Sequence, residues 1–144
     1  MENELIKSLV SIVSFFNRTD RDKKFVKAAG IDLEATSFQL FVTIGRMQPT
    51  NVSDLANLMG KSHSSVSRQI DKLEKRGLIV TRDSEKDARI RSIQLSKQGT
   101  ELTATIDETR LAEIKTVMSD WSDDEKQNLL ENLQHLASTL NNLE

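Results

Sequence analysis

The chain has 144 residues, a formal net charge of −2 and 37% hydrophobic residues, which suits one domain or one domain with a dimerisation arm. It contains no cysteine, and this excludes disulfides, thiolate catalysis, thiol-based redox sensing and cysteine-ligated zinc. One proline and five glycines are too few for the many turns of a sandwich or barrel, so the composition predicts a mainly helical protein.

The first predicted element is an amphipathic helix over residues 3–17. Leu5, Leu9, Ile12 and Phe16 share one stripe, because they are spaced four, three and four residues apart. The apolar run within this helix is interrupted by two serines and is too short to cross a bilayer. The chain also begins without the basic leader of a secretory signal. We therefore expect a cytoplasmic protein that does not enter the membrane.

A second helix is predicted over residues 35–46. Its expected inner face consists of apolar or small residues that recur with helical spacing: Phe38, Phe41, Val42 and Gly45. Pro49 marks the break after this helix.

The next two helices are predicted to be joined by a tight turn. Asn51 is a good N-cap for the first of them, and Asp54 stands at its N3 position. Gly60 is placed to end this helix in a left-handed conformation. Ser62 is expected to cap the second helix, which Gly77 closes. The pattern predicts a helix-turn-helix.

The second helix of this pair, residues 62–76, is expected to be buried on one side only. Val66, Ile70 and Leu73 form its apolar stripe. The opposite face carries hydrogen-bond donors and cations, namely Ser64, Ser65, Arg68, Gln69 and Lys72. A helix of this kind can read the major groove of DNA. The alternative is an ordinary face that only contacts solvent.

A short β-hairpin is predicted after this helix, with strands at 78–82 and 90–95. The loop between them, residues 83–89, is too charged to pack and should project into solvent or onto a partner. From Lys61 to Ser92 there are nine cations and five anions, whereas the rest of the chain has 11 cations and 17 anions. A basic segment inside an acidic protein is typical of a local phosphate-binding surface. A solvated helix face would also explain this charge pattern.

Two further helices are predicted at the C-terminal end. Ser96 is expected to cap the first, which runs, with interruptions, to about Asp120. Ser122 and Glu125 form the capping box of the last helix. That helix carries leucines with heptad spacing: Leu129, Leu133, Leu136, Leu140 and Leu143.

The apolar stripes of the terminal helices are too long for the small middle of the chain to cover. We therefore expect a homodimer in which the N- and C-terminal helices of two subunits bury each other. In the alternative, the same helices fold back on one another within a monomer.

The chain resembles the MarR (multiple antibiotic resistance regulator) family of winged helix-turn-helix transcription factors over nearly its whole length. The strongest segment is residues 51–99. The residues that carry the resemblance include Leu55-Ala56, Gly60, Val66-Ser67, the run Leu73-Glu74-Lys75-Arg76-Gly77-Leu78, Asp87-x-Arg89, Ile93, Leu95-Ser96 and Gly99. The resemblance implies a mainly α fold with a β-hairpin wing. It implies a dimerisation helix at 1–34, a winged helix-turn-helix at 35–99 and dimerisation helices at 100–144.

Residue roles follow from the same resemblance. The recognition helix would lie in the major groove, with Ser64, Ser65, Arg68 and Gln69 near base edges or phosphates. Arg89 matches the wing arginine that enters the minor groove, and Asp87 matches the acidic residue that steadies the wing. Ala88 departs from the pattern, because many members carry another basic residue there. The complete predicted DNA-binding set is Ser62, His63, Ser64, Ser65, Arg68, Gln69, Lys72, Arg76, Lys86, Asp87, Arg89 and Arg91.

The resemblance also implies partners. It implies an obligate homodimer bound to a pseudo-palindromic operator on double-stranded DNA, most often as a repressor. Family members often respond to small anionic or phenolic effectors that bind between the dimer arm and the winged domain. In this chain, residues 35–46 and the break near Trp121 would border such a cleft.

Catalytic and metal-binding functions are not predicted. The sequence contains no G-x-S-x-G, no H-E-x-x-H and no phosphate-cradling glycine loop, so an enzyme is not expected. The acidic group Asp120, Asp123, Asp124 and Glu125 stands at a helix start, where carboxylates are favourable without a metal. No metal and no cofactor are therefore predicted. The main alternative function is a winged-helix module that binds another protein instead of DNA.

Overall fold

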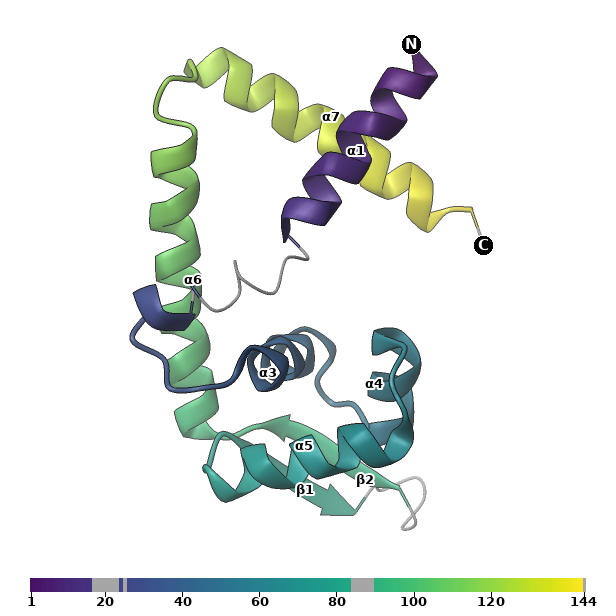
Figure 1. Ribbon diagram of the computed structural model, residues 1–144, viewed down its shortest axis with the longest axis vertical. Coiled ribbons are helices and arrows are strands. Elements are labelled where there is room, and N and C mark those ends of the chain that lie inside the picture. Colours follow the sequence, from purple (N-terminus) through teal and green to yellow (C-terminus); the bar gives the residue numbers. More distant parts are fainter. Residues whose placement is uncertain (17–23, 25, 84–89, 144) are drawn as a thin grey trace. The chain divides into compact units, whose positions relative to one another are not determined.

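The computed structural model describes residues 1–16, 24, 26–83 and 90–143, and it is mainly helical with one hairpin (Figure 1). The elements in chain order are α1 (Glu2–Phe16), α3 (Ala35–Met47), α4 (Val52–Met59), α5 (His63–Lys75), β1 (Ile79–Asp83), β2 (Arg91–Leu95), α6 (Lys97–Val117) and α7 (Asp123–Asn141). The predicted order of elements is confirmed. The chain divides into two compact units, Met1–Asp107 and Glu108–Glu144. Over the described ranges, no helix is both long and apolar enough to span a bilayer.

The predicted caps of α4 and α5 are present. The backbone N–H of Asp54 donates to Asn51 Oδ1 at 2.8 Å, and the Asn51 side chain returns a hydrogen bond to Asp54 Oδ2 at 3.0 Å. Gly60 follows α4 with a φ of 64°, the left-handed conformation that glycine adopts without steric cost. At α5, Ser65 N–H donates to Ser62 Oγ at 3.2 Å. The helix-turn-helix is thus built by short-range capping interactions.

Helix α3 is buried more completely than its predicted inner face suggests. Phe38 and Phe41 are buried as expected, but Val42 and Gly45 are only half-buried. Leu40 and Ile44, which were not predicted to face inward, are fully buried. The reason is that α3 contacts α4, α5 and β2, so that neighbours cover it on more than one side. The core also includes Val26, Ile31 and Leu33 from the segment before α3.

Strands β1 and β2 form an antiparallel hairpin in which Ile79 pairs with Leu95 and Asp83 pairs with Arg91. Burial alternates over Ile79–Arg82 of β1 and over Ile93–Leu95 of β2, as expected for a hairpin packed on one face, while the ends next to the connecting loop are exposed. Ile79 and Ile93 are on the buried face, which packs against the helices. Thr50 forms an isolated bridge to Ile93, with N–H to O distances of 3.1 and 2.8 Å in the two directions.

A compact joint links the end of α5 to the start of α6. Ser96 Oγ donates to the carbonyl oxygen of Gly77 at 2.5 Å, and Ser96 N–H donates to that of Leu78 at 3.0 Å. The same Oγ accepts the N–H of Gly99 at 3.0 Å and so caps α6, as predicted. The turn that closes α5 is therefore held to the first turn of α6.

In the C-terminal part of the chain, α6 is one continuous helix that ends at Val117, so the predicted interruptions are not found. Residues 118–120 form a turn. The predicted capping box of α7 is present, because Ser122 accepts from the N–H of Glu125 while the Glu125 carboxylate accepts from the N–H of Ser122. Apolar side chains on these helices remain exposed within one chain, among them Leu111, Ile114, Val117, Leu130, Leu133 and Leu140.

Candidate nucleic-acid interface

Helix α5 has one buried face and one exposed face. Val66, Ile70 and Leu73 are all 4% exposed or less, because their spacing of four and three residues places them on one stripe against the core. The opposite face is exposed and carries three of the six contacts predicted within α5, namely Ser64, Arg68 and Lys72, while His63 is exposed in the first turn of the helix. Ser65 and Gln69 lie at the boundary of this face and are half-buried. The exposed side chains of α5 therefore offer a partner the Ser64 hydroxyl and two cations on the outer face and the His63 imidazole at the N-terminal end.

Ser62 caps the N-terminal end of α5. Its Oγ accepts the N–H of Ser65 and lies 3.4 Å from the Oγ of Ser64. The side chain of Ser62 is thus engaged in capping the helix. The remaining N–H groups of the first turn lie at the positive end of the helix dipole, which favours an anion such as a phosphate.

Arg76 stands at the C-cap of α5, where it pairs with an acidic residue of the N-terminal segment. Its Nη2 lies 3.6 Å from Asp32 Oδ2, and both side chains are exposed. An exposed pair of this kind contributes little free energy, so Arg76 can exchange it for a phosphate. The predicted role of Arg76 as a DNA contact stays a prediction.

Of the residues predicted to contact DNA from the wing, the structure describes only Arg91. Lys86, Asp87 and Arg89 lie in 84–89, outside the described residues. Arg82 and Arg91 flank this segment on β1 and β2 and are exposed. Because faces alternate along a strand, Arg91 shares the face of buried Ile93, whereas Arg82 lies on the outer face.

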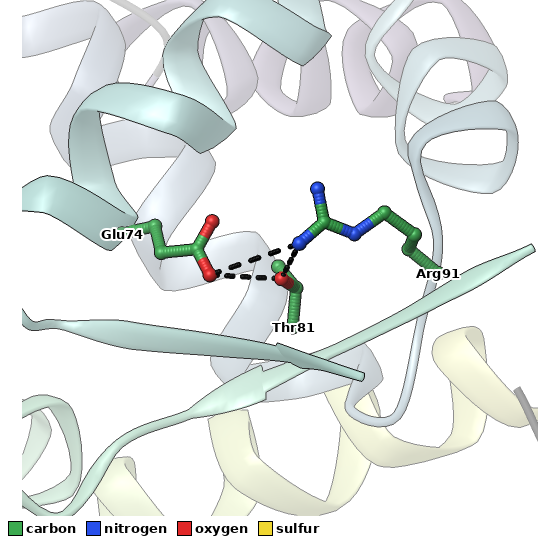
Figure 2. Close-up of polar contacts among 3 residues, drawn as sticks. All are labelled: Glu74, Thr81 and Arg91. Atoms are coloured by element: carbon green, nitrogen blue, oxygen red, sulfur yellow. Dashed lines mark hydrogen bonds and ion pairs between the residues drawn. The ribbon is translucent and has the colours of Figure 1, made fainter. Parts of the chain in front are cut away.

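Arg91 belongs to a polar cluster with Glu74 and Thr81, two residues outside the DNA-binding set predicted from the sequence (Figure 2). Thr81 Oγ1 donates to Glu74 Oε1 at 2.8 Å. Arg91 Nη2 donates to Thr81 Oγ1 and lies 3.9 Å from Glu74 Oε1. Two signals could have indicated this cluster: the strand alternation places Thr81 and Arg91 on one face, and a glutamate in the last turn of a helix opposes the dipole unless a cation is near.

In the ranges that the structure describes, no three His, Asp or Glu side chains lie together as a metal ion would require. The acidic residues at the start of α7 act in its capping box and first turn.

Comparison with known sequences identifies a family. The model of the MarR family matches residues 31–90, which include α3, α4, α5 and β1. The transcriptional repressor MprA of Escherichia coli K12 is 30% identical over 123 residues, which cover 84% of this chain and 69% of that protein. An uncharacterised HTH-type regulator of Bacillus subtilis, YfiV, is 28% identical over 112 residues, covering 78% of this chain and 70% of the relative.

Comparison with solved structures gives the same fold. A MarR family protein from Bacillus stearothermophilus superposes with a TM-score of 0.78 at 18% identity, covering 98% of this chain and 99% of the other. FabT of Streptococcus pneumoniae, solved in complex with DNA, superposes with a TM-score of 0.64 at 20% identity, covering 99% and 96%. These likenesses confirm the winged helix-turn-helix fold.

Proposed function

Because this chain belongs to the MarR family of transcriptional regulators, we propose that it represses transcription by binding a pseudo-palindromic DNA operator as a homodimer. Family membership also makes it a regulator and not an enzyme. Two comparisons support the finer proposal. MprA is a transcriptional repressor, and FabT was solved bound to DNA.

The observation that carries DNA binding is the one-sided burial of α5. Its apolar stripe is held in the core, so Ser64, Arg68 and Lys72 on the opposite face cannot turn inward. A major groove about 12 Å wide admits a helix, and arginine, lysine and serine side chains are suited to base edges and phosphates. We propose the twelve residues predicted from the sequence as the DNA contacts, with Arg89 reaching the minor groove.

The homodimer is proposed because apolar side chains on the terminal helices are exposed to solvent in a single chain. On α1, Ile6 is 58% exposed and Val10 is 59% exposed. On α7, Leu133 is 46% exposed and Leu140 is 55% exposed. Water disfavours apolar stripes of this length on a monomer, and a second copy would cover them. We assign dimerisation to residues 1–34 and 100–144 and DNA binding to residues 35–99.

A dimer would also suit the target. Two recognition helices related by a two-fold axis would enter successive major grooves about 34–36 Å apart, on one side of the duplex. The operator should therefore contain two inverted half-sites. Clustered cations around α5 and the hairpin would neutralise phosphates at both half-sites, so affinity should fall steeply as salt rises.

The test selects bound duplexes from a random-sequence pool and titrates them by gel shift at two salt concentrations. Sedimentation velocity gives the oligomeric state of the same preparation. The proposal expects inverted repeats among the selected duplexes, tight binding at low salt and a dimer. A monomer would favour terminal helices that cover one another within one chain. A chain that ignores duplex DNA in dilute salt would instead favour a winged-helix module that binds another protein.

Release from DNA by a small anionic or phenolic effector is proposed from the family resemblance alone. The test titrates a panel of phenolic acids into the protein by calorimetry and into the protein–DNA complex by gel shift. Binding heat together with a weaker complex would support an effector that shifts the dimer towards a state unable to bind DNA. The absence of both effects would exclude effectors of this chemistry.

A further inference from the structure

Glu74, Thr81 and Arg91 come from three different elements, yet one hydroxyl connects them (Figure 2). Glu74 is in the last turn of α5, Thr81 is in the middle of β1, and Arg91 is the first residue of β2. A threonine hydroxyl has one hydrogen to donate and lone pairs to accept. Here it donates to Glu74 Oε1 at 2.8 Å and accepts from Arg91 Nη2. The cluster therefore ties the recognition helix to both strands of the wing.

The position of Glu74 is unfavourable unless it has a cationic partner. The last turn of a helix carries the negative end of the dipole, which favours Lys72 and Lys75 but opposes a carboxylate. Arg91 Nη2, 3.9 Å from Glu74 Oε1, supplies the compensating charge. The side chains are 37% exposed at Glu74 and 58% exposed at Arg91, so the pair is only partly screened by solvent.

Arg91 keeps donors for another partner while it is held. The described contacts of its guanidinium all involve Nη2. Figure 2 shows the other terminal nitrogen turned away from Glu74 and Thr81. Because arginine has five N–H donors, a guanidinium fixed through one nitrogen can still bind a phosphate through the others.

We infer that Glu74 and Thr81 are positioning residues that hold Arg91 beside the end of α5, so that the wing and the recognition helix bind the backbone of the same DNA. The inference rests on the proposed DNA-binding function. Holding the long side chain in advance removes part of its rotamer freedom before DNA arrives, so less is lost on binding. The same contacts set the angle between the hairpin and α5, which determines whether both reach the duplex together.

The test is a double-mutant cycle measured as affinity for duplexes that the wild-type chain has selected from a random pool. Thr81→Val keeps the shape and removes the bridging hydroxyl, and Glu74→Gln removes the charge. Each change should weaken binding about 3- to 10-fold in the wild-type background. Neither should weaken it further in an Arg91→Ala background, because the group that they position is gone. Thr81→Ser, which restores the hydroxyl, should regain most of the affinity.

Asp71→Asn is the matched control for Glu74→Gln. Asp71 is exposed on the same helix, so the control removes the same charge away from Arg91. It should not weaken binding, because losing a negative charge near DNA reduces repulsion. Circular dichroism melts identify any variant that fails to fold. Because Glu74→Gln and Thr81→Val are each paired with Arg91→Ala separately, either one can test the inference if the other fails to fold.

Four results would overturn the inference. Tighter binding by Glu74→Gln would mean that the carboxylate competes with phosphate for Arg91. Equal losses with and without Arg91 would mean that Glu74 and Thr81 act through stability alone. If the wild-type chain selects no duplex at all, the proposed function itself fails and the positioning role fails with it. A wild-type chain that binds while the cycle shows no coupling overturns the positioning role only.

Discussion

Gly99 lies so close to Leu78 that a Cβ atom built on it would fall 2.0 Å from the Leu78 carbonyl oxygen. This contact is between backbones, so neither partner can rotate away. It places the first turn of α6 directly on the turn that follows α5, where Ser96 bonds to Gly77 and Leu78. Glycine is thus required here for close approach, although the position is helical.

Gly99→Ala should therefore destabilise the fold by about 2–3 kcal/mol, the usual range for forced overpacking. The measurement is the urea midpoint of unfolding followed by circular dichroism. Gly45→Ala is the matched control, because a Cβ there would meet Leu95 Cδ1 at an ordinary 3.5 Å. Alanine is also favoured over glycine within a helix by up to about 1 kcal/mol, so this control should be neutral or stabilising. Equal losses at both sites would contradict the close-packed joint.

Substitutions at Ser62 should separate folding from DNA binding. Ser62→Ala removes the acceptor for the Ser65 N–H and should cost about 1 kcal/mol of stability. Ser62→Asp keeps an acceptor and complements the helix dipole, so stability should be retained. Its negative charge at the edge of the proposed interface should nevertheless weaken DNA binding. Thermal melts measure the stability of both variants, and gel shifts measure their affinity for DNA. Normal DNA affinity in Ser62→Asp would mean that this end of α5 is not part of the interface.

Arg68→Ala should weaken binding to the selected duplexes by about 1–3 kcal/mol. The side chain is exposed on the outer face of α5, so the melting temperature should stay unchanged. Lys115→Ala, which removes an exposed cation from α6, is the control and should leave affinity within experimental error. Gel-shift titration gives both values. If the two variants behave alike, general charge and not α5 would govern binding.

Arg89→Ala should also lower affinity by about 1–3 kcal/mol, with the greatest loss for duplexes that have A·T-rich flanks. A narrow minor groove carries an enhanced negative potential, and this is the site that the family resemblance assigns to the wing arginine. Titrations on duplexes that differ only in the flanks measure the effect. An unchanged curve on every duplex would remove the wing tip from the proposed interface.

Leu136→Asp should dissociate the dimer or unfold it, because the charge would enter the apolar seam of α7. Gln134→Asp is the matched control, since it adds the same residue two positions away, outside the leucine stripe. Sedimentation velocity over a range of protein concentrations distinguishes the two. A stable dimer in Leu136→Asp would show that α7 does not provide the seam.

Features that depend on residues within one or two helical turns were predictable from the sequence. The N-caps at Asn51 and Ser62, the capping box at Ser122 and the left-handed Gly60 are all confirmed. Each cap depends on a side chain and a backbone group three residues apart, and the conformation of Gly60 depends on its lack of a Cβ atom, so the local pattern contains all the necessary information. The buried stripe of α5 was predictable for a related reason, because helical periodicity identifies one face before its partner is known.

Features that join distant parts of the chain became visible only once the elements had packed. Helix α3 is buried by α4, α5 and β2 together, so its own periodicity underestimates its buried face. Gln48 Oε1 accepts the N–H of Leu95 at 2.9 Å, and Arg76 meets Asp32, across separations that no local pattern encodes.

The candidate site likewise has one part that the sequence predicts and another that only the packed structure shows. Amino-acid order was enough to predict the exposed polar face of the proposed recognition helix, since the outward residues of α5 follow from one helical period. For Arg91, strand alternation indicates only that Thr81 shares its face; the register of β1 with β2 and the docking of β1 against α5 determine that Thr81 and Glu74 both contact it. Hydrogen bonds act over about 3 Å in space, whatever the number of residues that separate the two groups along the chain.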